Sequence, residues 1–258
     1  MKIIYLLLIY LSLSASVITV QYVGELSFFG KVGEATLEYH NDGKKYHIKI
    51  SGGGTGIVGK LTQHKQYVYE SSGIVVDNQL LPLKYTGREI SPDLNKTKIY
   101  TFDYDHNKTI VMQYKAENKL VSKFNVNTFK FDKACKVVEE NSTKELDRVY
   151  KDDMVSIMFN KRNNLLYMKQ GETKLVEAVG SDDTQDGVIV RFLEKKDDKY
   201  VYSVTVKKDY LEGGSKDVKF ILDENNILFE TKVEGIVFFG NARIIRKDEE
   251  DNSTLPEH

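Results

Sequence analysis

Four asparagines stand in the pattern Asn-x-Ser/Thr, which is the acceptor pattern for N-linked glycosylation. In each case an acidic residue stands two positions before the asparagine. A bulky glycan requires an acceptor asparagine on an exposed, flexible segment. The four candidate sites are Asn95, Asn107, Asn141 and Asn252, preceded by Asp93, Asp105, Glu139 and Glu250.

The acidic position carries information about the cellular compartment. Asp/Glu-x-Asn-x-Ser/Thr resembles the acceptor site of bacterial oligosaccharyltransferases, which work in the periplasm. All four sites fall in segments that we expect to be loop, linker or tail. The pattern therefore predicts a periplasmic N-glycoprotein of a Gram-negative bacterium. The alternative interpretation is that polar loops are simply rich in these residue types.

The N-terminus has the pattern of a signal peptide. Lys2 provides a minimal positive charge, Ile3–Leu13 is an apolar run, and the small residues Ser14–Ser16 supply a cleavage site after Ser16. Residues 1–16 are therefore predicted to direct export to the periplasm, with no transmembrane span after their removal. The alternative is a retained anchor, because Val17–Val20 extends the apolar run.

One glycine-rich segment comes close to a nucleotide-binding pattern. Gly54–Lys60 resembles a phosphate-binding loop, but that loop needs Ser or Thr directly after the lysine to hold Mg²⁺, and Leu61 stands there. An exported protein also meets no ATP pool. We therefore interpret the segment as a flexible turn between strands, and we predict no cofactor.

The sequence gives only weak evidence for a metal-binding site or a reactive thiol. His40 and His47 flank one turn and could form a two-ligand surface site, but ordinary exposed histidines have the same pattern. The acidic residues 182–186 lack the ligand spacing of a calcium-binding EF-hand. Cys135 is the single cysteine, so no internal disulfide can form. It is either inert or forms an intermolecular disulfide, and we predict no metal site.

Composition and motifs argue against most enzyme classes and against nucleic acid. The chain has 37 basic and 38 acidic residues with no basic stripe, so a nucleic-acid partner is not expected. It has no Gly-x-Ser-x-Gly nucleophile elbow. Paired acids for glycoside hydrolysis cannot be selected from 38 scattered acidic residues. We expect a protein that is not an enzyme, with an envelope hydrolase as a remaining alternative.

The strongest structural signal lies in Tyr22–Ile50. Apolar and polar residues alternate there with the period of two that is typical of half-buried strands. The pattern predicts two β-segments hinged at Gly30, a turn at Asn41–Gly43 and a third strand. A shorter echo, Phe238–Gly240, indicates that the first and last strands belong to one curved sheet.

The rest of the chain predicts a mainly β fold. We expect one domain, residues 17–247, formed by a strongly curved antiparallel sheet, as a barrel or half-barrel with one short helix. Lys151–Asn160 is the helix candidate, with Asp152 or Asp153 as its cap. Residues 133–150 lack strand alternation and are interpreted as a charged linker, and residues 248–258 as a disordered acidic tail. Further strands are predicted at Gln66–Ser71, Leu80–Glu89, Lys98–Tyr104, Thr109–Lys115, Ser122–Asn127, Val188–Glu194, Tyr200–Lys208, Val218–Leu222, Ile227–Val233 and Ile236–Arg246.

Several short motifs, in order along the chain, resemble the bacterial DUF3108 family. They are FGKVGEA at Phe29–Ala35, LPLKY at Leu81–Tyr85, DMVS at Asp153–Ser156 and the pair Phe239–Gly240. The resemblance covers roughly Tyr22–Lys247. It implies an exported, β-rich protein of unknown function, and it carries over no catalytic residues.

The aromatic residues suggest a function. Eight of them are predicted on inward faces, where they either pack a core or line an apolar cavity for a lipid or a lipoprotein-like ligand. The first hypothesis is a periplasmic module that binds or carries an apolar or amphipathic envelope ligand. The second is a structural or interaction protein of the envelope that uses its sheet edges or the charged linker. The candidate lining residues are Tyr22, Phe28, Tyr39, Tyr46, Tyr200, Tyr202, Phe229 and Phe238.

Overall fold

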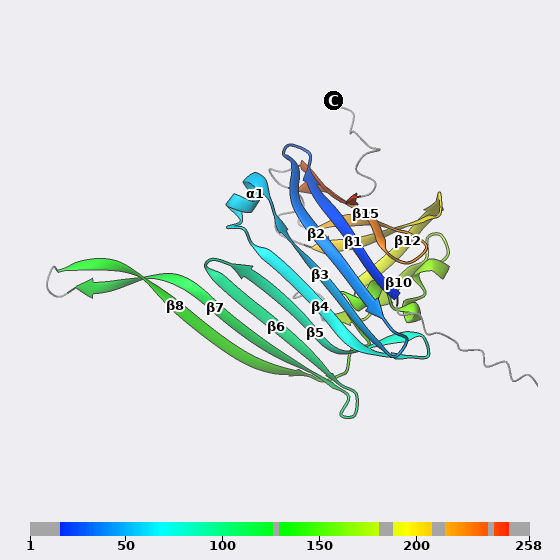
Figure 1. Ribbon diagram of the computed structural model, residues 1–258, viewed down its shortest axis with the longest axis horizontal. Helices are drawn as coiled ribbons and strands as arrows, with labels where there is room; N and C mark the ends of the chain where they lie inside the picture. Colours follow the sequence, from blue (N-terminus) through cyan, green and yellow to red (C-terminus); the bar gives the residue numbers. More distant parts are fainter. Residues whose placement is uncertain (1–15, 126–128, 181–187, 208–214, 237–239, 248–258) are drawn as a thin grey trace, which may run out of the picture.

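The computed structural model describes residues 16–125, 129–180, 188–207, 215–236 and 240–247. Most of these residues lie in one antiparallel sheet of 14 strands, in the order β10-β12-β13-β14-β15-β16-β1-β2-β3-β4-β5-β6-β7-β8 (Figure 1). The mainly β, antiparallel fold class is therefore confirmed. The sheet ends at β10 and β8 and is not closed in the described part of the chain, so a barrel is not confirmed.

The strands of the first half follow one another as neighbours. Their bounds are β1 (Ser16–Leu26), β2 (Gly30–Asn41), β3 (Lys45–Gly54), β4 (Gln66–Val76), β5 (Gln79–Ser91), β6 (Leu94–Asp103), β7 (Lys108–Asn125) and β8 (Lys130–Leu146). Each pairs with the next through a short connection, as expected for an antiparallel meander. The longer β3–β4 connection contains the only α-helix among the described residues, α1 (Gly56–Leu61).

The strands of the second half complete the sheet on the other side of β1. They are β10 (Thr173–Val176), β12 (Val188–Lys196), β13 (Lys199–Lys207), β14 (Ser215–Leu222), β15 (Leu228–Ile236) and β16 (Gly240–Arg246). Two short strands, β9 (Asp152–Asp153) and β11 (Ala178–Val179), form a separate parallel pair. Three 3₁₀-helices lie between them: η1 (Ser156–Met158), η2 (Lys161–Asn163) and η3 (Leu165–Tyr167).

The first and last strands lie side by side, as the sequence predicts. β16 pairs with β1 from Tyr22↔Arg246 to Leu26↔Ala242. The predicted hinge at Gly30 is wrong in detail, because β1 and β2 are two antiparallel strands joined by a tight turn. Gly30 has φ of +63° at that turn, a backbone conformation that glycine adopts without steric cost. The turn reverses the chain where alternation alone suggested a bend.

The segment interpreted as a linker is an edge strand for most of its length. Residues 130–146 form β8, which pairs with β7 in an unbroken register from Thr109↔Leu146 to Asn125↔Lys130. β6 pairs with β7 only as far as Glu117, so the rest of the β7–β8 hairpin extends beyond the sheet as a two-stranded ribbon (Figure 1). Most described β8 side chains are exposed, which explains why alternation was absent.

The predicted helix at Lys151–Asn160 is also wrong as an α-helix. Its first residues form β9, and only the single 3₁₀ turn η1 follows. The N-cap position of η1 is Val155, which makes no side-chain cap, so the predicted cap is not at the helix start. Asp153 nevertheless accepts hydrogen bonds from the backbone N–H groups of Val155 and Ser156, both at 2.9 Å. The local hydrogen bonding of Asp153 was readable from the sequence, whereas tertiary packing determined what followed it.

Residues 150–180, which we call the covering segment, pack against one face of the sheet. Tyr150, Val155 and Val179 join a core with Tyr46 and Tyr85, and we call the face that carries these two tyrosines the inner face. A second core forms where the same segment meets β12–β14. Its buried members are Ile157, Leu165, Met168, Val176, Ala178, Val190, Phe192, Tyr202 and Leu222. Met154 packs against both cores and so connects the two halves of the sheet.

Candidate functional site: an apolar trough on the inner face

A trough of about 680 Å³ lies on the inner face of β1–β4. It occupies the ends of these strands that lie away from the contacts with the covering segment. Its surface is mostly apolar, as is usual for sites that bind small molecules. The lining residues are Tyr22, Gly24, Gly33, Glu34, Ala35, Ile50, Gly52, Gly53, Gly54, Tyr67, Tyr69 and Ile244.

A row of glycines forms the floor of the trough. Gly24 of β1 stands opposite Gly33 of β2, which stands opposite Gly54 of β3. In the neighbouring row Gly52 is required by close packing, because a Cβ there would lie 2.8 Å from the Cβ of Ala35. Since opposed residues of an antiparallel sheet project from the same face, the row from Gly24 to Gly54 replaces side chains with backbone. A Cβ at Gly24 would make only ordinary contacts, at 3.7 Å or more, whereas a Cβ at Gly54 would lie 3.2 Å from the backbone of Gly59 in α1.

Tyrosines form the walls. The Tyr22 hydroxyl donates a hydrogen bond to the Leu228 carbonyl at 3.0 Å, and burial raises the pKa of Tyr22 to about 12. The rings of Tyr67 and Tyr69 lie nearly parallel with their centroids 6.5 Å apart. These rings give the trough broad apolar walls with hydroxyl groups on them.

A second hollow, of about 120 Å³, continues the trough across β5 and β6. The two hollows share Tyr67 and Tyr69, which therefore stand between them. The second hollow also exposes Glu89, Lys96 and Lys98. The inner face thus changes from apolar to charged along the direction of the trough.

Two adjacent carboxylates of the covering segment are buried against the sheet. Asp153 is fully buried and accepts a hydrogen bond from the Ser71 hydroxyl at 2.6 Å, and the Ser71 hydroxyl lies 3.1 Å from that of Tyr46. Burial raises the pKa of Asp153, while the hydrogen bonds from Ser71 and from the backbone of Ser156 oppose that effect. The carboxylate therefore anchors the covering segment to β3 and β4.

The neighbouring Asp152 has a similar role. Its carboxylate oxygens accept hydrogen bonds from the side-chain amides of Asn160 at 2.6 Å and Asn163 at 3.2 Å. The Asn160 amide also donates to the Leu80 carbonyl at 2.8 Å. Burial raises the pKa of Asp152 to about 6, although these amides and the nearby Arg162 favour the charged form.

The paired acids do not resemble a hydrolytic site. Asp152 and Asp153 are 1% and 0% exposed, and each already accepts hydrogen bonds from the protein. Glycoside hydrolysis needs two carboxyl groups that face each other across an accessible bond of the substrate. Their arrangement fits an anchor for the covering segment, and it gives no support to the hydrolase alternative.

The structure places the predicted lining residues in different environments. Tyr22 is a buried member of the first core that also lines the trough. Tyr39 and Tyr46 lie in or against the first core, and Tyr200 and Tyr202 lie in or against the second. Phe238 lies outside the described residues.

Two of the predicted lining residues do not face inward. Phe28 is 74% exposed, because the chain turns at that point instead of continuing as a strand. Phe229 lies beneath the ammonium group of Lys199, which is 3.3 Å from its ring centroid. Successive side chains of a strand point to opposite faces. Leu228, which precedes Phe229, therefore packs against the core in its place.

Sequence reasoning missed the walls and floor of the trough. Tyr67 and Tyr69 lie in a strand that was predicted, and the spacing of two already put them on one face. The sequence pattern predicts strand only as far as Ile50 and a flexible turn at Gly54–Lys60, whereas β3 continues to Gly54. The available signal was the recurrence of glycine at alternate positions of adjacent strands.

The glycosylation sequons lie partly outside loops. Asn107 is in the β6–β7 turn, as expected, but Asn95 lies in β6 and Asn141 in β8, so the expectation of loop or linker is wrong for these two. All three side chains are exposed. Asn252 lies outside the described residues.

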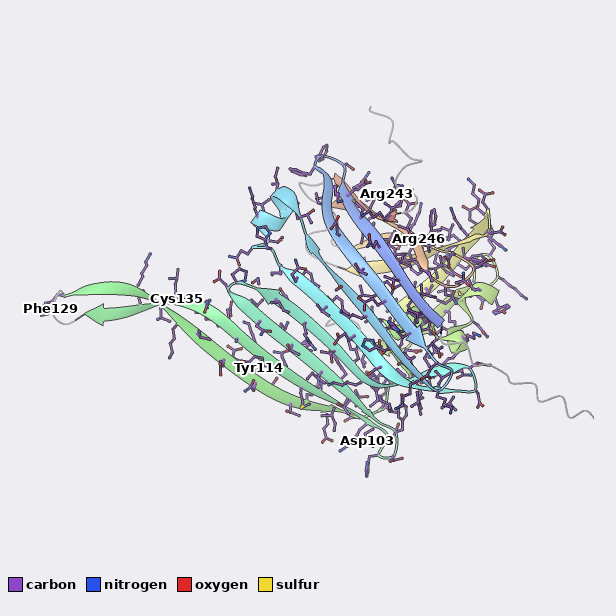
Figure 2. All side chains as sticks on the ribbon, in the orientation of Figure 1. Asp103, Tyr114, Phe129, Cys135, Arg243 and Arg246 are labelled. Carbon is purple, nitrogen blue, oxygen red and sulfur yellow. The ribbon has the colours of Figure 1, made fainter. Side chains whose placement is uncertain are left out.

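The other candidate functional residues, the histidines and the cysteine, do not form a site among the described residues. His40 and His47 stand directly opposite each other on β2 and β3, and both are exposed. Within the described ranges, no group of three or more His, Cys, Asp or Glu side chains is placed so that it could hold a metal ion. Cys135 is exposed on the ribbon, where Figure 2 shows it between Phe129 at the tip and the body of the sheet. Among the described residues, no helix is both long enough and apolar enough to cross a membrane.

Comparison with known proteins gives a family and no function. No curated protein and no solved structure is detectably similar to the chain. One family, described as a protein of unknown function (DUF3108), matches residues 18–245, which include β2 to β15 and nearly all of β1 and β16. That match confirms the resemblance seen in the short motifs, and the chain belongs to the DUF3108 family.

Proposed function

We propose that the protein is a periplasmic, non-enzymatic module that holds the apolar part of an amphipathic envelope ligand in the trough. The observation that carries this proposal is the row Gly24, Gly33 and Gly54, which leaves a hollow on the inner face of the sheet. Elsewhere on the same face, tyrosines and the covering segment fill the space.

The physical basis is the burial of apolar surface. A hydrocarbon chain removed from water gains roughly 25 cal/mol for each Å² buried, and a hollow of about 680 Å³ is within the usual size of ligand sites. Tyr67 and Tyr69 supply aromatic walls for such a chain. Their hydroxyl groups would interact with the polar end of the ligand.

The compartment and the modification are part of the same proposal. They are supported by the signal-peptide pattern of residues 1–16 and by the acidic sequons. Among the described sequons, that of Asn141 is exposed at all three positions, whereas Thr109 of the Asn107 sequon is buried and donates to the Arg148 carbonyl. Mass spectrometry of the native protein should therefore find more glycan on Asn141 than on Asn107. Unmodified peptides at every sequon, in a host with the transferase, would exclude glycosylation.

Binding in the trough is tested by filling its floor. A Cβ at Gly24 would meet its nearest neighbours, atoms of Gly33, at 3.7 Å, which is ordinary contact. Gly24→Leu should therefore fold while occupying the hollow. Thr19→Leu adds a similar side chain to the exposed opposite face of the same strand and serves as the control.

The readouts are native mass spectrometry of co-purified ligand and calorimetric titration with a decyl amphiphile. We expect Gly24→Leu to lose binding at least about tenfold at unchanged thermal stability, since the added side chain occupies the ligand's space. Thr19→Leu should bind like the wild type. Equal binding by all three proteins, or no binding by the wild type, would exclude the trough as the site.

A second candidate function is self-association through the edge strand β8. β8 forms one end of the described sheet, so its outer row of backbone groups has no strand beside it there, and its register with β7 has no bulge. Such a long, regular edge is a template for strand addition. The candidate partner is a second copy of the chain, joined in antiparallel orientation.

Charge complementarity supports this partner. In a two-fold arrangement with Val138 opposite its own copy, Lys136 of each chain stands opposite Glu140 of the other. All three residues lie on the same face of β8, because they are separated by even numbers of positions. Arrangements centred on Lys136 or Glu140 would instead place like charges opposite each other, which is unfavourable.

Disulfide trapping distinguishes this arrangement. On a Cys135→Ser background, Val138→Cys should cross-link two chains under mild oxidation, because opposed residues on paired strands lie within disulfide reach. Val137→Cys, one position away, would stand opposite Glu139 and should not cross-link. A monomer in light scattering, or equal cross-linking of both variants, would exclude the arrangement.

A further inference from the structure

Two short segments project from the sheet at the open end of the trough: helix α1 and the β1–β2 turn. α1 begins two residues after Gly54, which lines the trough, and the backbone N–H of Thr55 donates to the Val32 carbonyl at 2.7 Å. The turn joins the strands that carry Gly24 and Gly33, which also line the trough. Figure 1 shows both segments at the same end of the sheet.

α1 turns its apolar side chains to solvent. Gly59 faces the sheet and is the one buried residue of this helix, and a Cβ there would lie 2.7 Å from the Gly54 carbonyl oxygen. Ile57 and Leu61 lie one turn apart on the same side of the helix and are 62% and 69% exposed. A surface helix ordinarily buries such residues and exposes its polar ones. The close contact between the two glycines therefore fixes an orientation that water does not favour.

The β1–β2 turn exposes a large aromatic side chain at the same end. Phe28 is 74% exposed, and its ring rests against the backbone of Gly240, where a Cβ would lie 2.9 Å from a ring carbon. The neighbouring Phe29 is 43% exposed. Aromatic and aliphatic side chains are thus displayed together beside the trough.

The alternative explanation is that single exposed apolar residues are common on protein surfaces. Leu175 and Ile189 are a comparable pair, 55% and 58% exposed and directly opposed on β10 and β12. That pair does not line the trough, whereas α1 packs against Gly54 in the trough itself. Continuity with a proposed ligand site distinguishes the two projecting segments from this pair.

The charge of the two segments is compatible with a lipid surface. Residues 26–33 and 51–69 contain no Asp or Glu, although 38 of the 258 residues of the chain are acidic. Anionic headgroups therefore meet no like charge within these segments. Lys31 is balanced by Glu34 at 2.7 Å, so contact with a bilayer would depend on apolar insertion and not on attraction by charge.

The size of the surface favours a bilayer over a protein partner. A few apolar side chains expose on the order of a few hundred Å², which is less than the roughly 800 Å² that each partner contributes to a standard protein interface. Apolar side chains on protruding segments can instead insert between headgroups and acyl chains, where binding strength follows the apolar area removed from water.

We infer that α1 and the β1–β2 turn dock on a lipid bilayer, with Ile57, Leu61 and Phe28 inserted into it. The open end of the trough then lies at the membrane surface, so the apolar part of a ligand passes between trough and membrane without crossing water. The passage of a ligand rests on the proposed function, whereas docking is measured without any ligand.

A tryptophan reporter tests the insertion directly, because the chain contains no tryptophan of its own. Phe28→Trp should show a blue shift of its emission on addition of vesicles of phosphatidylethanolamine and phosphatidylglycerol, and quenching by lipids with brominated acyl chains. Tyr167→Trp, at a position of η3 that is 84% exposed, should show neither. A shift of Phe28→Trp that needs no vesicles and grows with protein concentration would indicate a second copy and overturn the inference.

Vesicle flotation measures the contribution of α1. Ile57→Ser/Leu61→Ser should lower the partition coefficient at least about tenfold, because two apolar side chains no longer leave water. Leu175→Ser/Ile189→Ser removes the same two residue types elsewhere and should partition like the wild type. Raising the salt should leave wild-type partitioning unchanged, since only interactions between charges are screened. Thermal denaturation checks that both variants are folded.

The failures of docking and of the trough are separable. No flotation of the wild type, equal losses in the two double variants, or a loss on raising the salt would overturn docking. Calorimetric titration with decyl glucoside then reports on the trough alone. Ile57→Ser/Leu61→Ser should bind this probe like the wild type, and a loss would place these residues in the trough and overturn docking. If the wild type floats with vesicles and does not bind the probe, docking stands, and the proposed function and the passage of a ligand are wrong.

Discussion

The two ends of strands β1–β4 share one face of one sheet, yet one end is filled and the other is open. At the filled end, Tyr46 and Ser71 meet the covering segment around the buried carboxylate of Asp153. At the open end, β1, β2 and β3 carry Gly24, Gly33 and Gly54, and no described segment fills the trough that these glycines leave. The comparison shows that side-chain size along a strand decides which part of the face becomes core and which becomes a site.

The filled end should be the more sensitive to mutation, and Asp153→Ala should have the largest effect. The change leaves the Ser71 hydroxyl and two backbone N–H groups without their acceptor in a buried place. We expect a loss of about 3–5 kcal/mol in the free energy of unfolding, measured by urea denaturation. Asp153→Asn keeps one oxygen for the backbone groups and should lose roughly half as much. Equal losses for both variants would contradict this expectation and would show that the negative charge, and not the oxygen that Asn retains, provides the stabilisation.

The pH dependence of stability tests the neighbouring carboxyl. The pKa of Asp152 is about 6 in the folded protein and lies above its ordinary value of 3.8. The folded state therefore holds this proton more tightly than the unfolded state, so this group adds stability as pH falls from about 7 towards about 4. The gain relative to Asp152→Asn should be about 2–3 kcal/mol over that range. A constant difference between the two proteins from pH 7 to pH 4 would contradict the raised pKa.

The two cores can be compared through one hydroxyl group in each. The Tyr46 hydroxyl is within hydrogen-bonding distance of Ser71, whereas the Tyr202 hydroxyl, among the described residues, is buried without a hydrogen-bond partner. Tyr46→Phe should therefore lower the free energy of unfolding by about 1 kcal/mol, while Tyr202→Phe should raise it by a similar amount. Thermal denaturation of the two variants checks both signs. A loss in both would mean that the Tyr202 hydroxyl has a partner in solution.

The sequence predicted the strands better than their arrangement. Alternation in Tyr22–Ile50 identified the residues of β1–β3, but it could not distinguish a bend at Gly30 from the reversal that occurs there. β8 escaped detection because a strand with exposed side chains on both faces has no hydrophobic period. Alternation depends on burial of one face, so it is informative only where something covers the strand.

The candidate site was harder to predict than the fold, for a related reason. Tyr22 was identified because it shares one face of its own strand with Gly24 and Leu26 in the alternating pattern. The floor of the trough depends on Gly24, Gly33 and Gly54 lying in one row across three strands. That row exists only once the register between strands is known, and register is a tertiary property.

Shortening the β7–β8 ribbon should have the smallest effect on the free energy of unfolding. The change tests whether the length of the edge hairpin contributes to stability. Residues 118–125 of β7 and 130–137 of β8 pair only with each other among the described residues, and Leu120 and Val137 on them are exposed. Replacing residues 122–133 with an Asn-Gly turn should change the free energy of unfolding by no more than about 0.5 kcal/mol, because it removes no described buried residue. Urea denaturation measures the free energy of unfolding, and hydrogen exchange should find the rest of β7 as protected as before.

A loss above about 2 kcal/mol would mean that the ribbon packs against another part of the chain or against a second copy. Light scattering of the shortened protein separates these two explanations, since only contact with a second copy would make the loss depend on protein concentration.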